Sequence, residues 1–116
     1  VPQAFAAAIG AGLFGGQRVD AARGTVYSGC VALGCVIRGE TSHYDIVANE
    51  STRALMQLAV EHAIPVGNGV LTVENRDQAL ARARVDGKNK GRGAALACLA
   101  LVRLKRAFHR HDPASV

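Results

Sequence analysis

The sequence contains no tryptophan, and aromatic residues make up only 4% of its 116 residues. Hydrophobic residues nevertheless reach 49%, so we expect a core of Ala, Val, Leu and Ile that is stabilised by buried area, without large aromatic anchors. The chain also lacks a long apolar run, because Gly, Arg and Asp interrupt every stretch before it approaches the roughly 18 residues needed to cross a bilayer. These absences predict a soluble domain with no membrane partner.

Cysteine is also scarce, since Cys30, Cys35 and Cys98 are an odd number with no Cys-x-x-Cys pair. With no recognisable secretory leader, this pattern predicts reduced thiols and a cytoplasmic protein rather than a disulfide framework. Residues 109–112 read His-Arg-His-Asp, but they lack the rigid ligand set of a metal site. We therefore expect no metal and interpret residues 109–116 as a flexible tail.

The formal net charge of +5 alone fits a nucleic-acid or anionic partner. Most of the basic residues come late in the chain, namely Arg82, Arg84, Lys88, Lys90, Arg92, Arg103, Lys105, Arg106 and Arg110. Apolar residues interrupt them at helical spacing, which favours a solvated helix face over a nucleic-acid surface. The distribution of charge therefore predicts no nucleic-acid partner.

Two short apolar runs are the expected strands. Residues 29–37 form a continuous apolar segment, which is typical of a strand buried on both faces. Residues 64–73 form the second, in which Gly67 and Gly69 indicate close approach of another backbone. Apolar positions at helical spacing predict helices at residues 42–62, 74–84 and 92–110.

This order of elements predicts the α/β class, as a three-layer αβα sandwich with a central parallel sheet. The length fits one domain, residues 1–116. Two strands are few for such a sheet, so either residues 1–28 supply more strands or the N-terminal part of the domain is missing or altered. In the second case one edge of the sheet lacks a partner strand.

The turn after the first strand is the best candidate for chemistry, because ligands of open α/β sheets bind beyond the carboxyl ends of the strands. Ser42 resembles a helix N-cap followed by an acidic first turn at Asp45. The free N–H groups of that helix start, with the Thr41 hydroxyl, are suited to hold a phosphate. His43 lies in the first turn of that helix, where an imidazole is suited to exchange a proton with a bound substrate, although an ordinary first-turn histidine explains the same residue.

Other candidates are weaker. Arginine and lysine side chains bind phosphate in many proteins, which makes Arg82 and Lys90 candidates. Each alone is equally typical of a surface cation. Cys35 ends the first strand without an evident base beside it, so we interpret it as a pocket wall rather than a nucleophile. Residues 10–15 match the Gly-x-Gly-x-x-Gly dinucleotide pattern, but they lack a long following helix and the expected acid.

The segment from residue 33 to residue 45 reads Leu-Gly-Cys-Val-Ile-Arg-Gly-Glu-Thr-Ser-His-Tyr-Asp. It closely resembles the central motif of the lumazine synthase family, V-I-R-G-x-T-x-H-[YF], which ends a strand and starts a helix. The likeness covers roughly residues 30–108 and continues through residues 47–50, 64–66, 69–75, 78–79, 82–83 and 89–91.

The resemblance implies a flavodoxin-like fold and a transferase of riboflavin biosynthesis. Such an enzyme condenses 5-amino-6-(D-ribitylamino)uracil with 3,4-dihydroxy-2-butanone 4-phosphate, releases phosphate and forms 6,7-dimethyl-8-ribityllumazine without metal or organic cofactor. The resemblance also implies a cytoplasmic homopentamer, in some relatives part of an icosahedral shell, with active sites between adjacent subunits.

Matching the family motif residue by residue implies three groups in the site. His43 matches the histidine that moves protons during condensation and ring closure. Glu40, Thr41 and Arg82 match the phosphate-binding residues. The remaining matches, which lie against the pyrimidine substrate or close to it, are Ala4, Phe5, Cys35, Val36, Ile37, Asn68 and Lys90.

The N-terminus fits the family less well. Relatives carry V-P-G-A-[FY]-E-[LI]-P where this chain begins Val-Pro-Gln-Ala-Phe-Ala, so Gln3 and Ala6 depart from the pattern and Ala6 replaces a carboxylate. Asn68 replaces an aromatic residue, and Gly93 replaces a glutamate. Two alternatives therefore stay open, a catalytically impaired shell-forming or structural homologue, and a nucleotide-binding module at residues 10–15.

Overall fold

The computed structural model describes residues 1–14 and 26–110. Its elements follow in the order α1 (Pro2–Gly10), β1 (Cys30–Ile37), α2 (His43–His62), β2 (Val66–Val73), α3 (Arg76–Ala83) and α4 (Lys90–Arg110). The predicted order of strand, helix, strand and two helices is confirmed. The additional element is α1, where Pro2 occupies the start of the helix and loses no hydrogen bond because that position has no intrahelical N–H partner.

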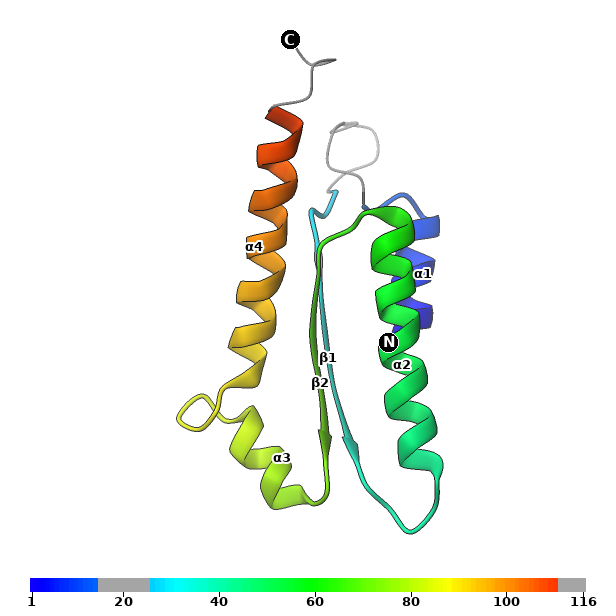
Figure 1. Cartoon of the computed structure of the whole chain (residues 1–116), viewed down its shortest axis with the longest axis vertical. Coiled ribbons are helices and arrows are strands. Elements are labelled where there is room, and N and C mark those ends of the chain that lie inside the picture. The colour runs from blue at the N-terminus through cyan, green and yellow to red at the C-terminus, as the bar shows by residue number, and fades with distance from the viewer. Residues whose placement is uncertain (15–25, 111–116) are drawn as a thin grey trace.

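The two strands are parallel and pair in register from Cys30 opposite Val66 to Ile37 opposite Val73. Helices α1 and α2 lie on one side of this sheet, and α3 and α4 lie on the other (Figure 1). This arrangement confirms the α/β class with three layers. Within the described residues the sheet has two strands, so the N-terminal residues 1–14 contribute a helix rather than the additional strands that a complete sheet needs.

The core between the sheet and its α1/α2 side contains Phe5, Ala32, Leu55 and Ile64. The Phe5 ring meets Phe14 edge-on, with ring centroids 5.3 Å apart. Such a pair adds about 1 kcal/mol beyond area burial. The expectation of a core without aromatic anchors is therefore wrong, because the few aromatic residues of this chain include a buried one.

The α4 side is packed closely because β2 carries glycines. A Cβ atom at Gly67 would collide with the carbonyl oxygen of Ala94, and one at Gly69 would lie 2.7 Å from the Leu33 side chain. The predicted close approach of another backbone is confirmed at Gly67, whereas at Gly69 the two nearest atoms belong to the side chains of Leu33 and Ala94. The buried residues of α4 are Ala94, Cys98 and Val102, which recur every four residues along one face.

The apolar strand β1 is less buried than its sequence predicts. Of its eight residues only Ala32 is buried, and Leu33 exposes 59% of its surface. The prediction of a strand buried on both faces is wrong for this structure, because β1 pairs with β2 alone and its other edge has no strand beside it in the described residues. The predicted unpartnered edge is therefore present.

The C-terminal helix ends at Arg110, as predicted, and begins at Lys90, two residues before its predicted start. His109 and Arg110, where the predicted helix and the predicted tail overlap, lie in this helix, and residues 111–116 lie outside the described residues. Among the described residues, none of the helices is both long enough and apolar enough to cross a membrane.

Candidate functional site

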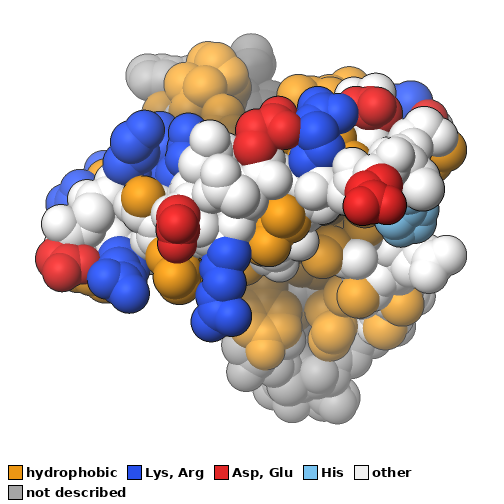
Figure 2. Space-filling model, turned by 90° about the horizontal axis from the view of Figure 1, so that it is seen from below, with side chains coloured by type: hydrophobic (Ala, Val, Ile, Leu, Met, Phe, Trp, Pro, Cys, Tyr) orange, Lys and Arg blue, Asp and Glu red, His pale blue; other side chains and the backbone are white. Residues whose placement is uncertain are grey.

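The carboxyl ends of β1 and β2 meet at one edge of the molecule, where the first leads into residues 38–42 and the second into α3 (Figure 1). Figure 2 looks onto this end and shows basic and acidic side chains beside one another across the surface. The predicted location of the site, after the first strand, is therefore a polar and open part of the molecule.

The start of α2 differs in detail from the prediction. Ser42 is the N-cap residue, as predicted, but its side chain makes no capping hydrogen bond. Instead the Thr41 hydroxyl accepts a hydrogen bond from the His43 N–H group at 3.3 Å. Glu40, Thr41 and His43 are all exposed, so the helix start remains accessible to an anion, which its unpaired N–H groups and the helix dipole favour.

Arg38 links the loop to its surroundings. Its backbone N–H donates to the Val73 carbonyl at 2.8 Å, and its Nε lies 2.9 Å from one carboxylate oxygen of Glu74 and 3.1 Å from the other. Nη1 is 3.7 Å from the Asp45 carboxylate, and the guanidinium carbon lies 4.3 Å from the centre of the Tyr44 ring. The hydrogen bond to Glu74 raises the pKa of Arg38 further, so the side chain stays charged.

Arg82 lies in the last turn of α3, and a network of hydrogen bonds links it to the start of that helix. Asn75 caps the helix through its side-chain oxygen, which accepts from the Gln78 N–H at 2.8 Å, and the Gln78 side chain in turn accepts from the Glu74 N–H at 2.8 Å. This reciprocal pair is a variant of the capping box. One turn later the Arg82 guanidinium donates to the Gln78 carbonyl at 3.1 Å, which orients the half-buried Arg82.

Three of the predicted site residues, Asn68, Arg82 and Lys90, line one hollow of about 390 Å³ between β2, α3 and α4, together with Gly93. The Asn68 side chain accepts a hydrogen bond from the Val70 N–H at 2.9 Å and so occupies its oxygen locally. The residues of the 38–43 loop are not among those that line this hollow. The structure therefore separates the predicted site into two groups.

The other predicted residues lie on β1 and α1. Cys35 and Ile37 are exposed, Val36 is half-buried, and Ala4 is exposed on α1. Phe5 is different, because it lies in the core and only 4% of its surface is exposed. In this structure Phe5 is a packing residue. Burial and the nearby Cys98 raise the pKa of the Cys30 thiol, which keeps that cysteine protonated.

Sequence reasoning missed the contacts of Arg38 and the role of Glu74 and Gln78. The signal for the cap was present, since Asn75 precedes Gln78 by the three residues that a capping box requires. Arg38 and Glu74 are 36 positions apart in the sequence. They meet because of the register of the two strands, which the sequence pattern does not specify.

The sequence also contains a glycine pattern typical of nucleotide sites and a His-Arg-His-Asp pattern that could suggest a metal site. The glycine pattern at residues 10–15 begins at the last residue of α1, whereas a dinucleotide fingerprint follows a strand; Gly15 lies outside the described residues. Among the described residues there is no cluster of three or more metal-binding side chains. His111 and Asp112 of the His-Arg-His-Asp pattern also lie outside the described residues.

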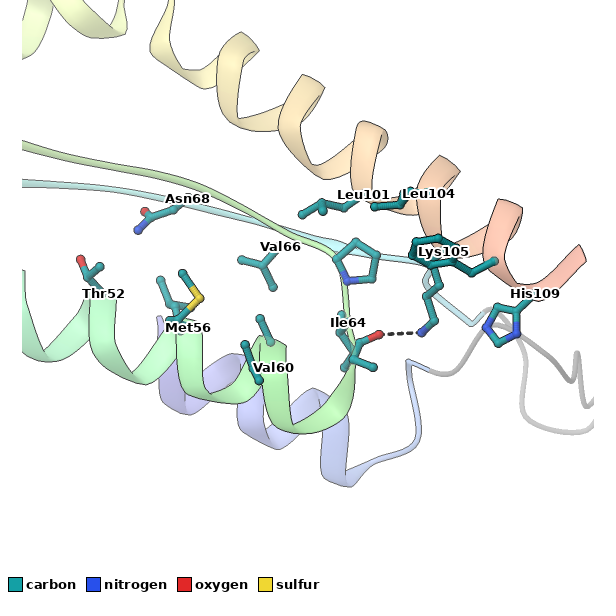
Figure 3. A pocket seen from close by; sticks show the side chains of 15 residues that line it. Thr52, Met56, Val60, Ile64, Val66, Asn68, Leu101, Leu104, Lys105 and His109 are labelled. Atoms are coloured by element: carbon teal, nitrogen blue, oxygen red, sulfur yellow. Dashed lines mark hydrogen bonds between the residues drawn. The ribbon is translucent and has the colours of Figure 1, made fainter. Parts of the chain in front are cut away.

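A larger and almost wholly apolar hollow of about 550 Å³ lies beside the other end of β2. Figure 3 shows that α2 contributes Met56 and Val60, and α4 contributes Leu101 and Leu104, on either side of Val66. Lys105 lies at this hollow and donates to the Ala63 carbonyl at 2.6 Å. Met56 and Val60 expose 64% and 72% of their surface, so exposed apolar side chains border the hollow.

Comparisons with known proteins agree with the motif. The sequence profile of the family described as 6,7-dimethyl-8-ribityllumazine synthase matches residues 17–106. The chain is 64% identical over 91 residues to the protein of that name from Methylorubrum extorquens, which covers 77% of this chain and 53% of the relative.

Two further relatives carry the same name. The protein from Methylorubrum populi is 58% identical over 107 residues, covering 92% of this chain and 59% of the relative. The protein from Agrobacterium fabrum is 61% identical over 83 residues, covering 72% and 56%. The chain thus spans about half the length of the curated relatives it matches. Because the profile matches most of the chain, the chain belongs to the 6,7-dimethyl-8-ribityllumazine synthase family.

Proposed function

We propose that this chain takes part in the reaction for which its family is named, the condensation of 5-amino-6-(D-ribitylamino)uracil with 3,4-dihydroxy-2-butanone 4-phosphate to 6,7-dimethyl-8-ribityllumazine in riboflavin biosynthesis. The observation that carries the proposal is the exposed helix start at Thr41 and His43, directly after the strand end. A phosphate bound there receives N–H hydrogen bonds and the positive end of the helix dipole.

His43 is the proposed catalytic residue, because an exposed imidazole beside a bound phosphate can pass protons to and from the condensing amine and ketone. Glu40, Thr41 and Arg82 are the proposed phosphate-binding group. The pyrimidine is proposed to lie against Cys35, Val36 and Ile37, with Asn68 and Lys90 nearby. Ala4 is proposed to contribute from the N-terminal segment, which the buried Phe5 holds to the core. Holding both substrates in register supplies most of the rate enhancement, and the reaction requires no cofactor.

A homo-oligomer is the proposed working form, a pentamer by family resemblance, acting in the cytoplasm. Two observations support assembly. The residues of the 38–43 loop do not line the hollow that holds Arg82, and a neighbouring copy that brings its own loop to this hollow would complete one site. The apolar hollow beside Val66 also exposes side chains that a subunit contact would bury.

The test is lumazine formation, followed by absorbance, from the two substrates at neutral pH. We expect product formation above the rate of the protein-free mixture, from protein whose mass in solution is that of an oligomer. An oligomer that binds both substrates yet forms no product would contradict the proposed reaction. That result would favour a catalytically impaired homologue. Ala6 and Gly93, which depart from the family pattern, would then be the first candidate causes of the lost activity.

A further inference from the structure

The loop at residues 39–42 is exposed throughout and has little packing of its own to hold it. The contacts that tether it come from its two ends. At one end Thr41 meets the His43 N–H. At the other, Arg38 contacts Glu74 at 2.9 Å, Asp45 at 3.7 Å and the Tyr44 ring at 4.3 Å. Arg38 therefore connects the end of β1, the first turn of α2 and the residue after β2.

The same set of contacts continues into α3. The Glu74 carboxylate forms an ion pair with Arg38, and the Glu74 N–H donates to the Gln78 side-chain oxygen at 2.8 Å. The Gln78 carbonyl then accepts from Arg82 at 3.1 Å. Each link is a direct hydrogen bond or ion pair, so a continuous path runs from the loop that carries His43 to the guanidinium of Arg82.

We propose that Arg38 and Glu74 form a positioning brace, which holds the loop carrying Thr41 and His43 and the helix carrying Arg82 in fixed relation to each other. The inference rests on the proposed function in one respect, that both groups serve the phosphate-bearing substrate. If subunits share sites as proposed, one brace serves the loop of one site and the arginine of the adjacent site.

The chemistry of arginine suits this role. Its planar guanidinium can stack on the Tyr44 ring while its edge bonds the Glu74 carboxylate, whereas a lysine ammonium is a point charge on a flexible stem. Exposed ion pairs contribute little to the free energy of unfolding because water screens them. A brace of this kind therefore affects the geometry of the site far more than the stability of the fold.

The test compares Glu74→Gln and Arg38→Lys with Arg53→Gln as the matched control. Arg53 also forms an exposed ion pair, with Glu50 at 2.8 Å on the same helix α2, but it has no contact with the loop among those described. Two measurements are made on the full chain in its assembled form, amide hydrogen exchange and the steady-state constants for both substrates.

We expect amide exchange to rise in residues 39–46 and also in residues 76–83 for both brace variants, and to change in neither segment for Arg53→Gln. The KM for the phosphate-bearing substrate should rise about tenfold, with a smaller change for the pyrimidine and a melting temperature equal to that of the control. The KM of the double variant should be no higher than that of the more impaired single variant, because the two residues act as one unit.

Exchange that rises in only one of the two segments, or additive effects in the double variant, would overturn the brace. So would a rise in KM that Arg53→Gln reproduces. Hydrogen exchange does not depend on turnover, so the brace is still tested if the chain forms no lumazine. Absence of product with coupled exchange in both segments would reject the proposed function and keep the brace.

Discussion

The two ends of the sheet differ in how they are held together. At the amino ends of the strands, Ala32, Leu55 and Ile64 are buried, and α4 approaches so closely that Gly67 has no room for a side chain. At the carboxyl ends Val73 is also buried, but exposed hydrogen bonds and ion pairs around Arg38 and Glu74 surround it. The amino end is held by apolar packing, while the carboxyl end adds polar contacts that position groups near solvent.

This difference follows from the energies involved. Burying a large apolar side chain contributes about 2 kcal/mol, whereas an exposed ion pair contributes between about 0 and 1 kcal/mol. Substitutions of the buried apolar residues should therefore lower the free energy of unfolding most, and substitutions of the exposed ion pair should change function with little loss of stability.

The largest effect is expected for Leu55→Ala, which removes a side chain that exposes only 2% of its surface. The cavity and the lost transfer energy should lower the free energy of unfolding by about 3 kcal/mol, measured by urea denaturation. Leu99→Ala is the control, since Leu99 exposes 49% of its surface and should cost about 0.5 kcal/mol. Equal losses in the two variants would contradict the assignment of the core.

Gly67→Ala should come next, with a loss of about 2 kcal/mol, because the new Cβ collides with the backbone of Ala94 and pushes α4 from the sheet. Gly93→Ala is the matched control on α4, where an added Cβ meets nothing within 4 Å. It should raise the free energy of unfolding by about 0.5 kcal/mol through helix propensity. Thermal denaturation of both variants distinguishes the two signs, and a stable Gly67→Ala would show that α4 packs less tightly than described.

At the carboxyl end, Asn75→Ala removes the cap of α3 and should lower the free energy of unfolding by about 1 kcal/mol. Asn75→Asp retains an acceptor oxygen and should keep most of that stability. Circular dichroism during chemical denaturation measures both. If alanine and aspartate behave alike, the hydrogen bond to the Gln78 N–H does not stabilise the helix.

The smallest effect concerns the three thiols. Cys35 is exposed, Cys98 is buried, and half-buried Cys30 has a raised pKa, so iodoacetamide at pH 8 should modify Cys35 first, as peptide mass spectrometry can measure. Because the folded state keeps the Cys30 proton that the unfolded chain loses, stability should also fall as pH rises above the ordinary thiol value of 9.0. Cys30→Ser should weaken that pH dependence, and first modification at Cys98 would contradict the described packing.

Much of the fold could be predicted because it depends on local patterns. The apolar runs predicted both strands, helical spacing predicted α2, α3 and α4, and Gly67 predicted the close approach of another backbone, which the structure shows to be that of α4. The burial of Phe5 and the exposure of Leu33 could not be predicted in this way. Each depends on which elements lie beside it in space, and periodicity along the chain does not specify that.

The candidate site was predicted in part. Its position after β1 follows from the rule that ligands of parallel sheets bind at the carboxyl ends of the strands, and the motif around His43 identified the family. The separation of Arg82 from the loop depends on α3 lying on the opposite side of the sheet from α2. The ion pair between Arg38 and Glu74 depends on strand register, which brings together residues distant in sequence.

The most direct test of the central proposal, that the helix start after β1 carries the chemistry, compares lumazine formation by His43→Ala and His62→Ala. Both histidines are exposed and lie at opposite ends of α2. We expect His43→Ala to slow turnover by about a hundredfold or less without abolishing it, and His62→Ala to match the unmodified chain. Equal rates in both variants, or total loss in His43→Ala with substrate binding intact, would contradict the account.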